Sequence, residues 1–129
     1  MPLPPLFALL AALGFSTAPA PPPPAADGWC EADGRWHDTD HETACEVREF
    51  VTSADLLDLA VTNGSVTVMP WDRADVLVRA RVQASAPDMA EAERLVAGTS
   101  VTVDGGHVRD AAPQTSRGRW VGVSYEVYA

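Results

Sequence analysis

The stretch HDTDHETAC, residues 37–45, is dense in side chains that could bind a metal. Its second half, His41-Glu42-Thr43-Ala44-Cys45, differs from the H-E-x-x-H motif of zinc metalloproteases, because Cys stands where the second His ligand belongs. That motif needs both ligands on one helix, whereas the flanking Asp and Thr residues favour a loop. A metal-dependent enzyme that uses His37, His41 and Glu42 is therefore the weakest of three hypotheses for this chain, and the other two, a structural role and a binding role, are given below.

The same stretch alternates oxygen ligands at Asp38, Asp40 and Glu42, an arrangement that could hold a divalent cation weakly. The sequence lacks the D-x-[DN]-x-[DN]-G loop with its distal Glu, so a solvated acidic loop is the simpler interpretation. It also lacks the G-x-S-x-G elbow, the phosphate-binding loop G-x-x-x-x-G-K-[ST] and G-x-G-x-x-G. We expect neither an enzyme nor a bound cofactor.

Two cysteines, Cys30 and Cys45, flank this polar stretch. In an oxidising compartment an isolated pair is most simply a disulfide, with free thiols or metal ligation as the alternatives. Closing a loop of about 15 residues stabilises a fold by roughly 3 kcal/mol in the chain-entropy model.

Four Trp residues are many for a chain of 129 residues. In a small β domain they pack more often at corners of the core than against a ligand. Trp29 and Trp36 are the expected exceptions, because they lie in the polar segment between the leader and the strands.

The N-terminus predicts export. Residues 6–15, LFALLAALGF, form an apolar run that spans only about half a bilayer, and APA at 18–20 is a small-residue cleavage pattern. A Pro/Ala-rich spacer follows. We therefore assign residues 1–26 to a signal peptide and spacer and residues 27–129 to one extracytoplasmic domain. An uncleaved export signal or a misassigned start codon is the alternative, and no transmembrane segment is expected beyond the signal.

The charge argues against nucleic acid as a partner. All nine basic residues are Arg, against eighteen acidic residues, which gives a net charge of −9. This charge opposes the counterion-release attraction that drives nucleic-acid binding, and it also disfavours anionic membrane surfaces.

Apolar residues alternate with polar ones from residue 46 onward, the period of β-strands. In residues 75–84, Val and Ala occupy one face, and Arg79 and Arg81 project from the polar face, where exposed pairs with acidic neighbours are expected. Asn63-Gly64 between two alternating runs predicts a type I′ turn that makes its flanking strands hairpin neighbours. The strand predicted near Ala129 would form a sheet edge through which chains self-associate.

One segment changes period. In residues 88–98, Asp88 and Glu91 resemble a capping box, the apolar positions share a helical face, and Gly98 is expected in the left-handed conformation that ends a helix. The sequence therefore predicts a mainly β fold, an antiparallel meander or β-sandwich or a solenoid-like sheet, with one short helix.

The order CEVREF, LDLAVTNGSVTV, WDRADVLVRARVQA, an Ala/Glu-rich helix and WVGVSYEVY resembles the opening of a bacterial putative adhesin family of unknown function. The resemblance covers about residues 45–128 and implies a solenoid-like β fold with a structural or adhesive role in the envelope. Since that family continues through further strands, it also implies that this chain is a fragment or a shortened relative. The alternative is a small module that binds a carbohydrate or a protein through its Trp-containing disulfide loop. Its partner in the envelope or outside the cell is not identified by the sequence.

Overall fold

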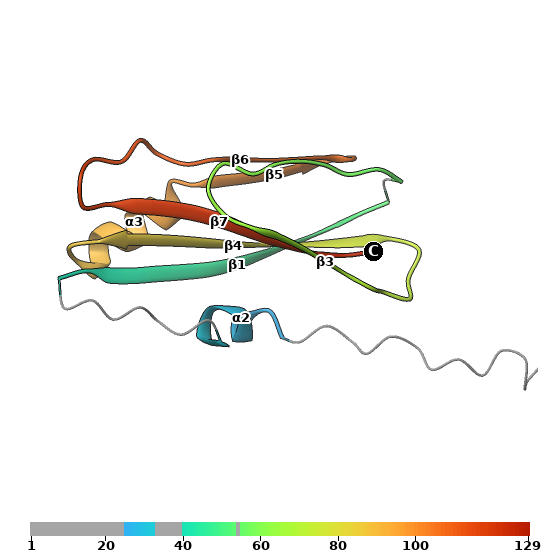
Figure 1. Cartoon of the computed structure of the whole chain (residues 1–129), viewed down its shortest axis with the longest axis horizontal. Helices are drawn as coiled ribbons and strands as arrows, with labels where there is room; N and C mark the ends of the chain where they lie inside the picture. The colour runs from blue at the N-terminus through green and yellow to red at the C-terminus, as the bar shows by residue number, and fades with distance from the viewer. Residues whose placement is uncertain (1–24, 33–39, 54) are drawn as a thin grey trace, which may run out of the picture.

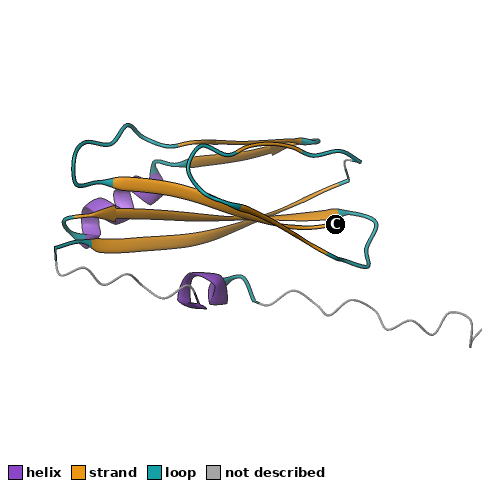
Figure 2. Ribbon diagram, viewed as in Figure 1, coloured by secondary structure: helices purple, strands orange, loops and turns teal. Residues whose placement is uncertain are grey.

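The computed structural model describes residues 25–32, 40–53 and 55–129. Figures 1 and 2 show two layers of strands with a helix on each side of the larger layer. The elements, in chain order, are α2 (Asp27–Ala32), β1 (Glu42–Thr52), β2 (Asp58–Ala60), β3 (Val66–Met69), β4 (Val76–Ala86), α3 (Met89–Ala97), β5 (Ser100–Asp104), β6 (His107–Ala111) and β7 (Trp120–Tyr128). The prediction of a mainly β fold is confirmed, but the described part holds two helices rather than one.

The strands form two sheets of mixed direction. The larger sheet has the order β1-β4-β7-β3, and the smaller has the order β2-β6-β5. β1, β4 and β7 pair antiparallel, whereas β3 runs parallel to β7, and β2 runs parallel to β6. Neither parallel pair joins strands that are neighbours in the sequence, so the fold is not a simple meander.

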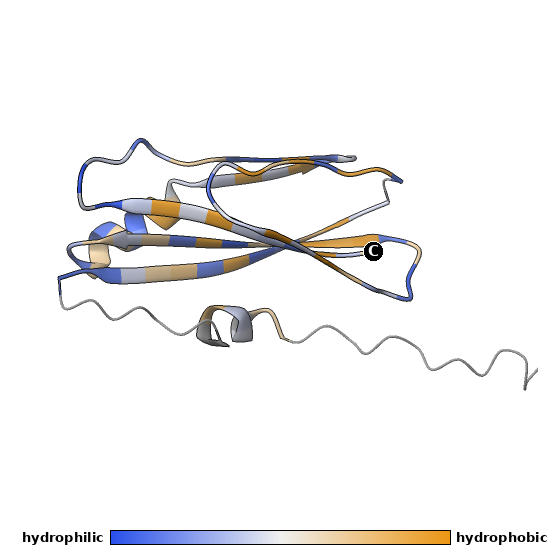
Figure 3. Ribbon diagram, in the orientation of Figure 1, coloured by the Kyte–Doolittle hydropathy of each residue, from blue (hydrophilic) through white to orange (hydrophobic). Residues whose placement is uncertain are grey.

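The core lies between the two sheets and is built by period-two alternation. Along β4 and β7 every second residue faces the smaller sheet, and hydrophobic and hydrophilic residues alternate along these strands (Figure 3). The buried cluster consists of Val78, Ala80, Val82, Ala84, Val96, Val108, Val121, Val123 and Tyr125. Tyr125 also donates a hydrogen bond of 2.7 Å from its hydroxyl to Asp110 Oδ2, which links the two sheets.

The predicted helix is present as α3. The Asp88 carboxylate caps its N-terminus by accepting a hydrogen bond of 2.8 Å from the Glu91 amide. The prediction for Gly98 is wrong, because this residue ends the helix with φ −80° rather than in the left-handed region. A glycine still suits the position, since a Cβ there would lie 3.0 Å from Pro113 Cγ.

The predicted hairpin at Asn63-Gly64 is wrong. β2 lies in the smaller sheet and β3 in the larger one, so residues 61–65 cross between the layers. The Asn63 carbonyl accepts from the Val123 amide at 2.9 Å, and the Asn63 side chain donates to the Val121 carbonyl at 3.0 Å. Gly64 is required by close approach to β7, because a Cβ there would lie 1.9 Å from the Val123 carbonyl oxygen.

The last strand is not an edge. β7 is hydrogen-bonded to β4 on one side and to β3 on the other, so the expected self-association through a C-terminal edge has no free edge to use. The outer strands of this sheet are β1 and β3. In the part of the chain that the structure describes, neither helix is long and apolar enough to cross a membrane.

Candidate binding site

The predicted disulfide joins Cys30 to Cys45, with an S–S distance of 2.02 Å and a Cα–Cα distance of 5.9 Å. Cys30 belongs to α2 and Cys45 to β1, so the bond fixes the short helix against the larger sheet. Figure 1 shows α2 on the side of β1 and β4 that is remote from β5 and β6. The prediction of the disulfide is confirmed, but the N-terminal segment that it holds is partly helical.

Trp29 uses this attachment to pack on the outer face of the larger sheet. Its ring centroid lies 4.7 Å from the Arg81 guanidinium carbon, a cation–π geometry. Trp29 is half-buried, and Arg81 is its structural partner. A ligand contact at Trp29 stays a prediction, and the second predicted contact, Trp36, lies outside the described residues.

The arginines of this face are buried, contrary to the expectation of exposed ion pairs. Arg79 and Arg81 are only 5% and 8% exposed. Arg79 Nε donates to Glu49 Oε2 at 2.7 Å, and Arg79 Nη1 lies 3.9 Å from Glu126 Oε1. Glu49 and Glu126 are its direct neighbours on β1 and β7, so the expected cross-strand pairing is confirmed for Arg79.

Aromatic rings extend the packing of this face beyond Arg79. The Arg79 guanidinium carbon lies 5.4 Å from the Tyr128 ring centroid, and Tyr128 lies 5.9 Å from Trp71. Arg73 covers the Trp71 ring at 5.1 Å. Burial, followed by the repulsion of the Glu126 carboxylate, raises the pKa of Tyr128. This half of the face is therefore closed by its own side chains.

The other half of the molecule is hollowed. An open cavity of about 1300 Å³ surrounds the end where the disulfide, α3 and the start of β7 meet, and we call it the disulfide-end groove. Its lining comes from α2, from β1 and the residue before it, from β4 and α3, and from the residues before and at the start of β7: Cys30, His41, Thr43, Ala44, Cys45, Glu46, Arg48, Gln83, Ser85, Met89, Glu93, Val96, Ala97, Gly118, Arg119 and Trp120. A cavity larger than the usual small-molecule pocket suits an extended ligand.

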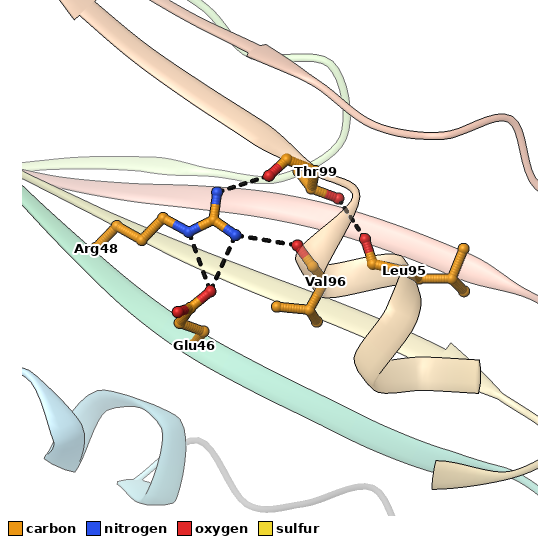
Figure 4. Close-up of polar contacts among 5 residues, drawn as sticks. All are labelled: Glu46, Arg48, Leu95, Val96 and Thr99. Carbon is orange, nitrogen blue, oxygen red and sulfur yellow. Dashed lines mark hydrogen bonds and ion pairs between the residues drawn. The ribbon is translucent and has the colours of Figure 1, made fainter. Parts of the chain in front are cut away.

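One wall of the groove is fixed by Arg48 (Figure 4). Its guanidinium donates to the Thr99 carbonyl at 2.6 Å and to the Val96 carbonyl at 3.0 Å, and it pairs with Glu46 Oε2 at 2.9 Å. Val96 lies in the last turn of α3 and Thr99 two residues beyond its end, and the Val96 carbonyl also accepts from the Thr99 amide at 3.1 Å. Arg48 therefore holds the C-terminal end of α3 over β1.

Arg119 fixes the other end of α3. Its guanidinium forms a two-point pair with Glu91, through Nε to Oε1 and through Nη2 to Oε2, the latter at 3.1 Å. The hydrogen bond to Glu91 holds the pKa of Arg119 above its usual value. Both arginines that line the groove thus have carboxylate partners, and neither presents an unneutralised positive charge.

Trp120 lies at the rim of the groove and is 44% exposed. Its six-membered ring lies against Gly122, because a Cβ on that glycine would be 2.4 Å from Trp120 Cη2 and 2.5 Å from Cζ2. The indole therefore packs on the strand through its six-membered ring, and the exposed part of the side chain faces the groove. Trp120 was not among the predicted ligand contacts, although Trp-x-Gly in a strand places the ring and the missing Cβ on the same face.

The predicted weak metal site at Asp38, Asp40 and Glu42 is described only in part and stays a prediction. Asp40 and Glu42 are exposed, and Asp38 lies outside the described residues together with His37. No group of three or more His, Cys, Asp or Glu side chains in the described ranges could hold a metal ion. His41 is instead part of the groove, and its Nε2 atom lies 3.9 Å from where a Cβ on Gly118 would be.

Comparison of the chain with family models, with curated proteins and with solved structures found no match.

Proposed function

We propose that this chain is a non-enzymatic, extracytoplasmic β-sandwich that acts as an adhesin-like binding domain, with the disulfide-end groove as its binding surface. The observation that carries the proposal is an open groove of about 1300 Å³ with a half-exposed Trp120 at its rim. Trp is enriched at binding hot spots, because its ring offers a large apolar face together with one hydrogen-bond donor.

The surroundings of the groove support binding rather than turnover. The groove lies on strands and on a helix that are held by a disulfide, by Arg48 and by Arg119. A rigid frame of this kind lowers the entropy cost of capturing a ligand. The disulfide and the apolar leader also fit an oxidising location outside the cytoplasm.

The test is to fill the groove. Ala97, an exposed lining residue, is replaced in Ala97→Trp, and Ala111→Trp is the matched control on an exposed alanine of β6 that does not line the groove. Intrinsic fluorescence is titrated with two probes, a neutral β-1,4-linked glucose hexasaccharide and a Lys/Arg-rich peptide. We expect at least one probe to bind the wild type and Ala111→Trp equally, and to bind Ala97→Trp at least about tenfold more weakly. If neither probe binds, or if Ala97→Trp binds like the control, the proposal is wrong.

A further inference from the structure

The groove contains an ordered row of groups beside Trp120. On the outer face of the larger sheet, Thr43 on β1 lies opposite Ser85 on β4, and Ser85 lies opposite Trp120 on β7. In the next row, Gln83 lies opposite Gly122, over which the Trp120 ring extends. Directly opposed residues have Cβ atoms about 5 Å apart, so the Ser85 hydroxyl and the Gln83 amide lie next to the indole, and the Thr43 hydroxyl follows one strand further along the row.

These polar groups are available to a ligand. Within the part of the chain that the structure describes, the side chains of Thr43, Ser85 and Gln83 form no hydrogen bond, although all three are half-buried and line the groove. A hydroxyl can donate and accept, and an amide offers two donors and one acceptor oxygen. Half-buried groups of this kind gain most from a ligand that supplies matching hydroxyls.

The charges of the groove favour a neutral ligand. Arg48 is neutralised by Glu46 and by two carbonyls, and Arg119 is neutralised by Glu91. An anion would therefore have to break an existing pair, and the net charge of −9 would repel it as well. Among the described residues that line the groove, no unpaired guanidinium remains to attract a phosphate, sulfate or carboxylate.

From these observations we infer that Ser85, Gln83 and Trp120 form a subsite for one pyranose ring of a neutral oligosaccharide, and that Thr43 lies where the next sugar unit would extend. The C–H face of the sugar packs on the exposed part of the indole, while its hydroxyls bond to the Ser85 hydroxyl and the Gln83 amide. This inference rests on the proposed function and names its ligand class.

Gly122 gives the sharpest test of this geometry. Gly122→Ala keeps every ligand-contacting group but pushes the Trp120 ring off the strand, since the new Cβ would lie 2.4 Å from Cη2. Trp120→Ala removes the ring altogether, and Trp71→Ala is the control, because Trp71 packs on Tyr128 and does not line the groove. Because Gly122→Ala also approaches the Asn63 carbonyl at 2.8 Å, Gln83→Ala serves as a second, milder variant.

The measurement is isothermal titration calorimetry of the full chain with hexasaccharides of β-1,4-linked glucose and of β-1,4-linked N-acetylglucosamine, and with oligogalacturonate as the anionic counterpart. We expect one neutral sugar to bind, with affinity reduced about tenfold or more by Trp120→Ala and Gly122→Ala, several-fold by Gln83→Ala, and not by Trp71→Ala. Melting curves confirm that each variant is folded.

Two results overturn the inference. One is binding of a neutral sugar that Trp120→Ala and Gln83→Ala leave unchanged. The other is preference for oligogalacturonate, or for the Lys/Arg-rich peptide with no neutral sugar bound. If only the peptide binds and Ala97→Trp abolishes that binding, the proposed function holds but the sugar subsite is wrong. If no probe binds, both the proposed function and the sugar subsite are wrong.

Discussion

Gly64 shows at the scale of one residue how a missing Cβ can fix the path of the chain. Its backbone lies so close to β7 that a Cβ would be 1.9 Å from the Val123 carbonyl oxygen and 2.6 Å from the carbonyl carbon. We expect Gly64→Ala to lower the free energy of unfolding by about 3 kcal/mol, because backbone atoms on two strands must separate to admit the methyl group. Urea denaturation measures this loss.

Gly28→Ala is the matched control for that substitution. Gly28 lies in α2, and a Cβ there would meet nothing within 4 Å. Alanine should therefore leave stability unchanged or raise it by up to about 1 kcal/mol through its better helix propensity. Equal effects of the two substitutions would show that close approach does not explain Gly64.

Tyr125 gives a residue-scale prediction that depends on pH. Burial, strengthened by the hydrogen bond to Asp110, raises the pKa of its hydroxyl above the usual value of 10.0. Because the fold favours the neutral phenol, its contribution is complete below about pH 10 and is lost as the pH rises towards the folded pKa. Tyr125→Phe should cost about 1–2 kcal/mol near neutral pH, through loss of the hydrogen bond that links the sheets.

The difference between wild type and Tyr125→Phe should then shrink above about pH 10, since phenylalanine cannot ionise. Urea denaturation near pH 7 and near pH 10.5 measures both differences, and Asp110→Asn, which keeps an acceptor oxygen, should cost less than Tyr125→Phe. A difference that is constant or grows with pH would contradict the burial of this hydroxyl.

At this scale the sequence could predict only what local spacing determines. The isolated Cys30 and Cys45 pair, the Asp88 cap and the buried face of β4 all follow from residue type and position. The burial of Arg81 could not be predicted, because Trp29, which covers it, reaches it only through the disulfide and α2. The exposure of Trp120 likewise depends on the groove, which is made by segments remote in sequence.

At the scale of elements, α3 depends on a side chain from another strand. Arg48 on β1 bonds to the Val96 and Thr99 carbonyls, and the Thr99 hydroxyl donates to the Leu95 carbonyl at 2.8 Å (Figure 4). We expect Arg48→Met to lower the free energy of unfolding by about 2–3 kcal/mol, because two carbonyls lose a charged donor while the apolar stem is kept. Thermal and urea unfolding followed by circular dichroism measure the loss.

Glu46→Gln is the control for Arg48. It weakens an exposed ion pair but leaves the bonds from Arg48 to α3 in place, so it should cost less than about 1 kcal/mol. Arg48→Lys should fall between the two, because an ammonium cannot reproduce the planar fork of donors. If Arg48→Met costs no more than Glu46→Gln, Arg48 does not anchor α3.

Strands and α3 could be predicted as elements, because their apolar periods of two and 3.6 are local. Their partners could not. β3 pairs in parallel with β7, so Val66 lies beside Tyr125, 59 residues later by the residue numbers, and no local pattern encodes that pairing. The Asn63-Gly64 signal was strong for a hairpin, but tertiary contact with β7 replaced the turn.

At the scale of the whole molecule, one sheet has two different coverings. The smaller sheet and α3 bury one face by apolar packing, whereas the opposite face carries buried arginines that are covered by Trp29, Tyr128 and ion pairs. The groove lies at the end of the sheet where α3, the disulfide and the start of β7 meet. The disulfide stands at this end, since Cys30 and Cys45 both line the groove.

The disulfide should therefore govern both stability and the binding surface. We expect the double variant Cys30→Ser/Cys45→Ser to lose about 3 kcal/mol in free energy of unfolding, since it frees a loop closed over a sequence separation of 15 residues. Reductant should produce the same loss in the wild type and none in the double variant. In both cases the fluorescence of Trp29, measured against Trp29→Phe, should shift towards that of a solvated indole, because α2 loses its attachment and Trp29 its stacking on Arg81. A reduced protein with unchanged stability and an unshifted Trp29 signal would mean that packing alone, without the covalent bond, holds α2 against the sheet.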